Sequence, residues 1–307
     1  MNDLHSYDVF GLCVASELPL PELASAPPAA EPDVYIRLDK IPASEGDKAG
    51  ITMFPDGALL RIPDVGRYWM AGGRDMIVEP AGGASPRNVR LFLLGSAIAA
   101  IIHQRALLPI HANAVVIDGR AIGFMGHPGA GKSTLAAWFH DRGFRVLADD
   151  VCVVTFGPDG RANAHPGIPR LRLTRGALEA SGRSAGDFEP AFDDREKYNV
   201  PTDAVTGRGS VPLDHFYLLE KADMREEAGI VRLAGADAVG ALVANTYRGG
   251  YLKLMGATAP HLFACTRLAR QVPVFAARRF WSLEAFDSEA GRLEAHARQI
   301  ISASASA

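Results

Sequence analysis

One short segment constrains the fold of this chain more than any other. Residues 126–133 read Gly-His-Pro-Gly-Ala-Gly-Lys-Ser and fit the pattern G-x-x-x-x-G-K-[ST] at every fixed position. An apolar stretch, residues 121–125, precedes the segment, and a second one with helical character, residues 134–139, follows it. Strand, glycine-rich loop and helix in this order form the context in which the pattern binds phosphate groups. The sequence therefore predicts a phosphate-binding loop. A chance glycine-rich turn with a surface lysine is the weaker alternative.

The residue types in this loop have separate roles in holding a nucleotide. Glycines let main-chain N–H groups approach an anion without a Cβ in the way. Lys132 adds positive charge at the β- and γ-phosphates, and Ser133 offers a hydroxyl to Mg²⁺. The following helix directs the positive end of its dipole at the anion. The expected nucleotide-binding residues are Gly126, His127, Pro128, Gly129, Ala130, Gly131, Lys132, Ser133 and Thr134.

Two adjacent acids, Asp149 and Asp150, follow the expected strand 145–148. A magnesium-binding acid sits at such a position beside a phosphate loop. One carboxylate would hold Mg²⁺ and the other would accept a proton from an attacking hydroxyl; which does which is left open. The alternative is a plain turn between strands, where Asp is common. His111 precedes the expected strand 112–117, and alone it fits a hydrogen-bonded core histidine as well as a catalyst.

The remaining sequence suggests two domains, since 307 residues exceed the usual size of one. Residues 1–87 are expected to form an N-terminal β-rich domain, with strands near 34–38, 58–62 and 76–78. Residues 88–307 are expected to form the phosphate-loop domain. It would contain helices at 88–106, 132–140, 234–247 and 283–301, a short helix within 171–181, and a hairpin at Asp118-Gly119. The polar stretch 182–194 is expected to be a loop able to close over substrate, and the Ser-Ala tail is expected to fray.

Composition excludes several classes of protein. The net charge of −3 provides no basic field for nucleic acid. The longest apolar run, residues 91–102, is shorter than the ~20 residues that span a bilayer. The three cysteines form no Cys-x-x-Cys pair and are expected to be buried, reduced thiols. No secretory signal is recognised at the N-terminus, so a cytoplasmic location is expected.

Three segments together resemble the catalytic domain of HPr serine kinase/phosphorylase: Pro109-Ile-His-Ala-Asn-Ala-Val-Val116, residues 126–134, and Arg142-Gly-Phe-Arg-Val-Leu-Ala-Asp-Asp150. The resemblance covers residues 107–156. It implies a domain related to PEP carboxykinase, with ATP and Mg²⁺ as cofactors and transfer to a serine hydroxyl. By position it assigns proton handling to His111 and Asp149, and support of the metal or the histidine to Asp150. The family's later E-I-R-G-x-G signature is absent. The chain is therefore more similar to HPr-kinase-related tailoring kinases, some of which phosphorylate the C-terminal serine of lasso peptides.

The sequence thus predicts an α/β fold with a mixed sheet around the phosphate loop and an N-terminal β-rich domain. The predicted activity is an ATP-dependent serine kinase acting on a peptide or small protein, without nucleic-acid or membrane partners. The alternatives are a kinase for a small hydroxyl compound such as free serine, and a nucleotide-dependent switch. A homo-oligomer is left open. The predicted catalytic residues are Asp149, His111, Asp150 and Lys132, the predicted metal ligands are Ser133 and Asp150, and Arg170, Arg195 and Lys197 are candidate cations near the transferred phosphate.

Overall fold

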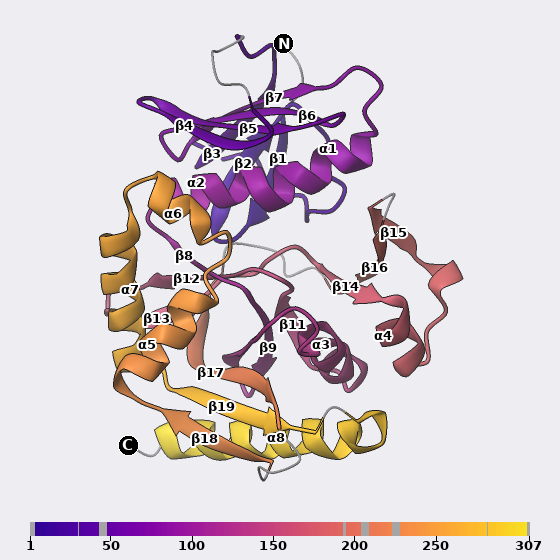
Figure 1. Ribbon diagram of the computed structural model, residues 1–307, viewed down its shortest axis with the longest axis vertical. Helices are drawn as coiled ribbons and strands as arrows, with labels where there is room; N and C mark the ends of the chain where they lie inside the picture. Colours follow the sequence, from indigo (N-terminus) through magenta and orange to yellow (C-terminus); the bar gives the residue numbers. More distant parts are fainter. Residues whose placement is uncertain are drawn as a thin grey trace.

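The N-terminal part of the chain forms a seven-stranded sheet. The computed structural model describes residues 4–29, 31–42, 48–192, 195–203, 209–222, 228–280 and 282–305. The N-terminal sheet has the strand order β1-β2-β3-β7-β6-β5-β4 and lies at the top of Figure 1. The expected strands within residues 34–80 are confirmed. The strands are β1 (His5–Val9), β2 (Leu12–Ser16), β3 (Val34–Leu38), β4 (Gly50–Phe54), β5 (Gly57–Ile62), β6 (Gly66–Ala71) and β7 (Asp75–Pro80).

A long helical segment lies between this sheet and the rest of the molecule (Figure 1). It consists of α1 (Pro86–Phe92), the π-helical turn η1 (Leu93–Ala97) and α2 (Ile98–Gln104). Its apolar residues share one core with the N-terminal strands. The expected buried helix is thus confirmed, and it packs with the sheet that precedes it. The predicted domain boundary after residue 87 remains a prediction.

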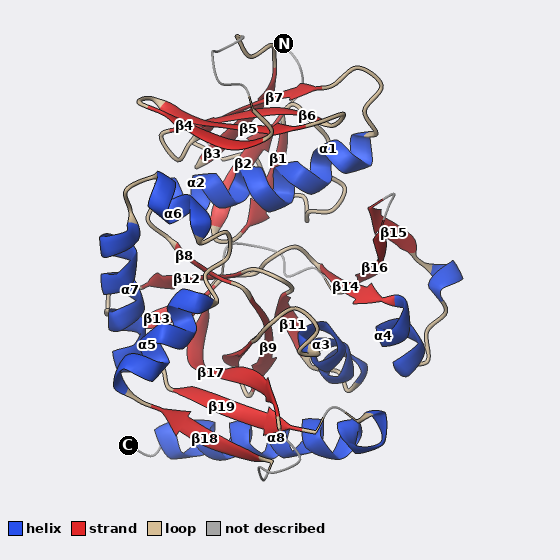
Figure 2. Cartoon of the chain, viewed as in Figure 1, coloured by secondary structure: helices blue, strands red, loops and turns tan. Residues whose placement is uncertain are grey.

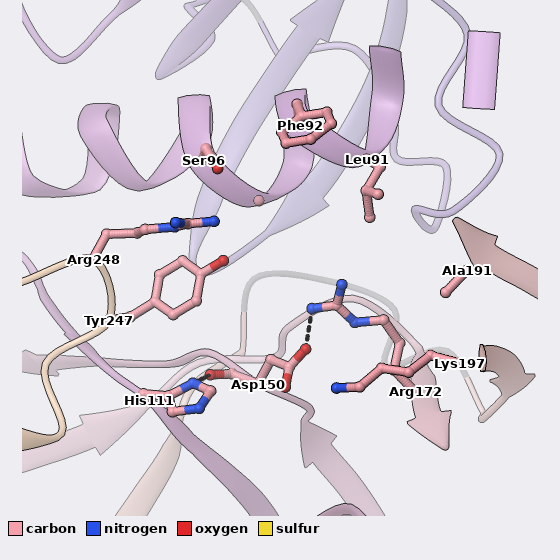
Figure 3. A pocket seen from close by; sticks show the side chains of 11 residues that line it. Leu91, Phe92, Ser96, His111, Asp150, Arg172, Ala191, Lys197, Tyr247 and Arg248 are labelled. Carbon is pink, nitrogen blue, oxygen red and sulfur yellow. Dashed lines mark hydrogen bonds and ion pairs between the residues drawn. The ribbon is translucent and has the colours of Figure 1, made fainter. Parts of the chain in front are cut away.

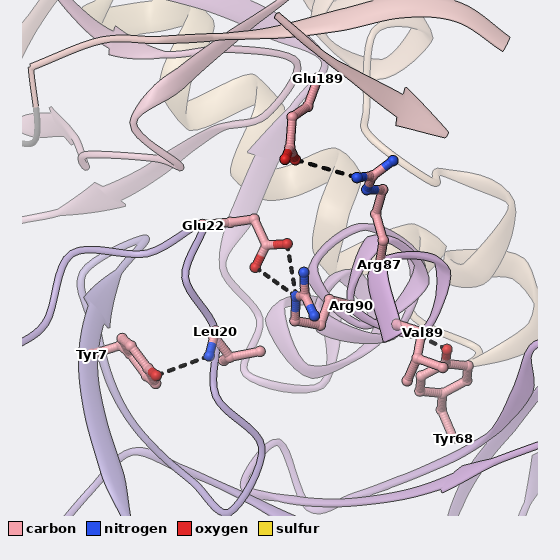
Figure 4. A network of polar contacts seen from close by, with 8 residues as sticks. All are labelled: Tyr7, Leu20, Glu22, Tyr68, Arg87, Val89, Arg90 and Glu189. Atoms are coloured by element: carbon pink, nitrogen blue, oxygen red, sulfur yellow. Dashed lines mark hydrogen bonds and ion pairs between the residues drawn. The ribbon is translucent and has the colours of Figure 1, made fainter. Parts of the chain in front are cut away.

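Polar contacts fix α1 on both sides (Figure 4). On the sheet side, the Tyr68 hydroxyl donates to the main-chain oxygen of Val89 over 2.9 Å. Nearby, the Arg90 guanidinium pairs with the carboxylate of Glu22 at 2.8 Å. On another side, the Arg87 guanidinium pairs with the carboxylate of Glu189 at 3.4 Å, so α1 contacts both the N-terminal part and a later part of the chain.

The second sheet is mixed, as the sequence predicts, and it carries the glycine-rich segment 126–133, which is called the phosphate loop below after its predicted role. Its strand order is β11-β9-β10-β17-β13-β12-β8; in addition, β19 pairs with β17, and β18 pairs with β19. β10, β17 and β19 run parallel, whereas β9 is antiparallel to both β10 and β11. The strands are β8 (Leu108–Ile110), β9 (Ala112–Ile117), β10 (Arg120–Met125), β11 (Arg145–Ala148), β12 (Cys152–Phe156), β13 (Ala162–Ala164), β17 (Val211–Lys221), β18 (Gly229–Leu233) and β19 (Val274–Arg279).

Helices cover both faces of this sheet (Figure 2). α3 (Lys132–Asp141) and α8 (Leu283–Ala305) pack against one face, in a core with β9, β10, β17 and β19. α5 (Gly235–Ala244) and α7 (Thr258–Gln271) pack in the second core, with α6 (Gly250–Leu254) between them along the chain. The predicted helices 132–140 and 234–247 are therefore confirmed. The expected frayed tail is wrong as far as Ala305, where α8 ends; residues 306–307 lie outside the described part.

A small third sheet, with the order β14-β16-β15, flanks the loop domain on the right of Figure 1. It comprises β14 (Arg170–Thr174), β15 (Glu189–Phe192) and β16 (Arg195–Pro201), with α4 (Arg175–Ala180) and η2 (Ala185–Asp187) in the connection. The prediction of a loop at 182–194 is wrong where η2 and β15 form; residues 193–194 lie outside the described part. The three thiols are free and buried, as expected. None of the helices described is both long and apolar enough to cross a membrane.

Candidate active site

The sheet register brings the three sequence motifs to one edge. Met125 at the end of β10 pairs with Ala112, the first residue of β9. Ala148 at the end of β11 pairs with Ala114 on the other side of β9. The phosphate loop, the paired acids and His111 therefore leave the sheet next to one another. This juxtaposition follows from the antiparallel placement of β9 between two strands that run the same way.

The phosphate loop has the backbone that its glycines permit. Gly126 has a φ of 145°, and a Cβ at this position would lie 2.9 Å from the main-chain oxygen of Leu219. Gly131 has a φ of 80°, in the left-handed region that L-residues avoid. The buried Lys132 side chain reaches back over the loop, and its Nζ donates to the main-chain oxygen of Gly126 at 2.7 Å and of His127 at 3.3 Å. Lys132 thus faces the loop as the motif requires.

Two residues that the sequence did not single out support this loop. The side-chain Oδ1 of Asn245 accepts from the N–H of Gly126 at 3.1 Å, and its main-chain oxygen accepts from the N–H of His111 at 2.6 Å. On the other side, Nη2 of Arg279 donates to the main-chain oxygen of Ala130 at 2.6 Å. Both residues lie far along the chain, at the end of α5 and the end of β19, and no local sequence pattern marks them.

The two adjacent acids have different surroundings. Asp149 accepts hydrogen bonds on both oxygens, from Nδ2 of Asn113 and from the main-chain N–H of Arg172, each at 2.8 Å. Asp150 instead pairs with the guanidinium of Arg172. Asp150 has a φ of 64°, so the chain turns sharply there and directs the two side chains into one region. The predicted end of the strand at these acids is confirmed, because β11 stops at Ala148.

These surroundings separate the pKa values of the two carboxyl groups. Burial and the neighbouring charge of Asp150 raise the pKa of Asp149 to about 7. Burial also acts to raise the pKa of Asp150, but the charges of Arg172, Lys197 and His111 outweigh it and hold that pKa below its usual value. At neutral pH, Asp149 can therefore exchange a proton, whereas Asp150 remains an anion.

His111 contacts the same turn. Its Nδ1 lies 2.9 Å from the main-chain oxygen of Asp150, so Nδ1 carries the proton and Nε2 keeps a free lone pair. Burial, followed by the charge of Lys132, lowers the pKa of His111. A neutral imidazole follows at neutral pH. Because the charge of Lys132 contributes to this pKa shift, His111 and the phosphate loop interact electrostatically.

A cavity of 420 Å³ opens beside these groups (Figure 3). His111, Asp150 and Arg172 form its floor, and the α1–η1 helix forms its roof through Leu91 and Phe92. Asp149 does not line this cavity. It lines a narrow adjoining cleft of 20 Å³ that shares Asp150 and Arg172 with the cavity.

The other candidate residues are spread around the loop. Lys197 lines the 420 Å³ cavity, and its role as a cation near the transferred phosphate stays a prediction. Arg170 lines the narrow cleft, and the side chain of Arg195 lies outside the described residues. Thr134 lines a separate cavity of 190 Å³ together with Gly129, Ala130, Gly131, Arg279, Phe280 and Phe286. The loop therefore lines one hollow, the one with aromatic side chains, whereas the cavity beside Asp150 is lined by residues outside the loop.

Comparisons with known proteins add little to this geometry. No protein-family model and no curated protein matches the chain. Among solved structures, the chain is similar to the HPr(Ser) kinase/phosphatase from Coxiella burnetii, with a TM-score of 0.32 and 11% sequence identity. The match covers 64% of this chain and 95% of that chain.

Proposed function

We propose that this protein is an ATP-dependent kinase that transfers the γ-phosphoryl group to a hydroxyl bound in the 420 Å³ cavity. The observation that best supports this proposal is that Lys132, Asp150 and His111 lie at one edge of the sheet, with a cavity beside the acids. Burial lowers the pKa of Lys132, and the charges of Asp150 and Lys197 act on that pKa as well. The phosphate-binding lysine and the cavity-lining groups therefore share one electrostatic environment.

ATP lies along the loop between the two hollows. The main-chain N–H groups of residues 126–131 and the ammonium of Lys132 hold the phosphates. The nucleoside extends past Thr134 toward Phe280 and Phe286, whose rings suit a planar base. The γ-phosphate then points the opposite way, toward Asp150 and Lys197.

The transfer step forms a bond between the acceptor oxygen and the γ-phosphorus and breaks the bond from that phosphorus to the bridging oxygen of ADP. Asp149 accepts the hydroxyl proton from the adjoining cleft, at the wall that Asp150 and Arg172 share with the cavity, and its raised pKa suits it to this role. His111 holds the turn at Asp150 through Nδ1, and its free Nε2 can accept a hydrogen bond from the acceptor. Lys197 and Arg172 stabilise the charge on the transferring group. The products are ADP and a phosphate ester.

The residues present also fit a magnesium ion. Ser133 is the second residue of α3, where the motif supplies a hydroxyl ligand. Asp150 remains an anion, and its charge affects the pKa of the neighbouring Lys132. Ser133 and Asp150 would hold the ion, which neutralises phosphate charge when bound. Arg172 occupies one oxygen of Asp150 and leaves the other for the metal or its water.

The acceptor is proposed to be a serine hydroxyl of a peptide or small protein, as the family resemblance implies, including the C-terminal serine of a lasso peptide. A cavity of 420 Å³ accommodates one such residue and its neighbouring groups. The proposed location is the cytoplasm, where ATP is available. A nucleotide-dependent switch would not need a cavity that binds an acceptor. The cavity beside Asp150 therefore favours phosphoryl transfer over a switch.

Transfer of labelled γ-phosphate tests this function. Wild-type protein and Asp149→Asn are incubated with Mg²⁺, labelled ATP and degenerate serine-containing peptides. We expect incorporation with the wild type, and unchanged ATP binding but no transfer with the variant. If the wild type hydrolyses ATP and labels no acceptor, or if Asp149→Asn transfers at the wild-type rate, the proposed chemistry is wrong.

A further inference from the structure

Arg248 enters the 420 Å³ cavity from the wall opposite Arg172 and Lys197 (Figure 3). Its guanidinium extends over the ring of Tyr247, 5.7 Å from the ring centroid, and points under the helical roof. Because Arg172 and Lys197 reach in from the other side, the cavity has a cation at each end.

The backbone at this position is strained and firmly anchored. Arg248 has a φ of 51°, which disfavours a residue with a Cβ. The Tyr247 N–H donates to the main-chain oxygen of Pro109 at 2.8 Å, and the Tyr251 N–H donates to the main-chain oxygen of Arg248 at 2.9 Å. Such a conformation persists where surrounding contacts fix it, and strained residues cluster at functional sites.

The positive charge of Arg248 has no protein counter-ion in the described part of the chain. No hydrogen bond or ion pair holds its guanidinium there, whereas Arg172 in the same cavity is paired with Asp150. The roof above Arg248 offers Ser96, with Phe92 and Leu91 farther along, and none of these side chains carries a negative charge. Because Arg248 is exposed, water solvates its guanidinium in the free protein, and an anionic group of a bound molecule would be its first charged partner.

The cations divide between the two ends. Arg172 pairs with Asp150, and Lys197 lies beside Arg172 on the same side of the cavity, so this side is the phosphate end. Arg248 lies on the opposite side, next to Tyr247. Lys197 is thus placed to meet the γ-phosphate, and Arg248 is left for the acceptor.

We propose that Arg248 binds a carboxylate of the acceptor and so positions the hydroxyl against the γ-phosphate. The substrate class is then a hydroxyl compound with a carboxylate on the same residue. A planar guanidinium suits a carboxylate because it can donate two parallel hydrogen bonds. Either free L-serine or a chain ending in serine supplies this chemistry. The proposal rests on the kinase function proposed above, and it adds a positioning residue and a requirement on the acceptor.

The test compares acceptors that differ only in the carboxylate. Labelled ATP is supplied with L-serine, L-serinamide, and degenerate hexapeptides that end in serine as the free acid or as the amide. We expect kcat/KM to be about 10- to 100-fold higher for an acid than for its amide, as for loss of a hydrogen bond to a charged group. Comparison of kcat/KM for L-serine with kcat/KM for the hexapeptide acid shows whether free serine or a chain ending in serine is the acceptor.

Arg248→Met keeps the apolar stem and removes the charge, so it should abolish the preference for the acid and leave the Kd for Mg·ATP unchanged. Arg270→Met, an exposed arginine of α7, is the matched control and should change neither. The proposal is overturned if acid and amide are equal in the wild type, if Arg248→Met slows both equally, or if it weakens ATP binding. Absence of labelling in all four acceptors with ATP bound also overturns it. Failure to bind ATP at all would instead defeat the proposed kinase function.

Discussion

The raised pKa of Asp149 leads to a quantitative prediction about pH. With a pKa of about 7, only about one-tenth of Asp149 is ionised at pH 6, whereas a carboxyl with its ordinary pKa would be almost fully ionised. A rate that needs ionised Asp149 should therefore fall about tenfold between pH 8 and pH 6. Two unit charges about 6 Å apart in an effective dielectric of about 20 repel by about 3 kcal/mol, or about 2 pKa units. Asp150→Asn should lower the pKa of Asp149 by about that amount.

Carbon-13 NMR of labelled aspartate carboxyls measures this directly in nucleotide-free, magnesium-free protein, with Asp149→Asn used for assignment. Asp118→Asn is a suitable control, because Asp118 is a half-exposed partner of Arg298 remote from the acids along the chain. The expected midpoint lies near pH 7 and moves to lower pH in Asp150→Asn alone. A midpoint near pH 4 in the wild type, or one unmoved by Asp150→Asn, would refute the electrostatic reasoning.

Two further predictions concern stability. A Cβ on Gly123 in β10 would lie 2.2 Å from the ring of Phe216, so Gly123→Ala should destabilise the fold by about 1–3 kcal/mol in chemical denaturation. Gly176→Ala, in open space on α4, should be neutral or stabilising by up to about 1 kcal/mol, and an equal loss in both variants would contradict the packing argument. Arg172→Met leaves Asp150 without its partner and should cost about 3 kcal/mol at neutral pH. Because protonation of Asp150 relieves that cost, the difference from the wild type should shrink in acid; a constant difference from pH 7 to pH 4 would contradict it.

The elements around the phosphate loop could be predicted because their signals are local. A glycine pattern, an Asp-Gly turn and apolar runs identified β9, β10, α3 and β11. The adjacency of His111 and the paired acids could be proposed only through the family resemblance. It depends on β9 pairing with strands on both sides, and strand order is not encoded in local periodicity.

Other parts of the site could not be predicted from local pattern. Asn245 and Arg279 act on the loop from positions more than a hundred residues away along the chain. Residues 189–192 read as a polar loop because their strand is stabilised by pairing with β16 rather than by alternating apolar residues. The cavity arises where the α1–η1 helix covers the loop domain, and its cation Arg248 is recognisable only in that setting.

The central claim is that the loop at residues 126–133 binds the phosphates of a nucleotide through Lys132 and main-chain amides. Calorimetric titration of a non-hydrolysable Mg·ATP analogue into wild type, Lys132→Ala and the exposed-lysine control Lys253→Ala tests it most directly. Lys132→Ala should bind the analogue about 10- to 100-fold more weakly than the wild type, because it loses hydrogen bonds between charged groups. The control should bind the analogue like the wild type. Equal affinity in Lys132→Ala and the wild type, or no binding by the wild type, would contradict the account.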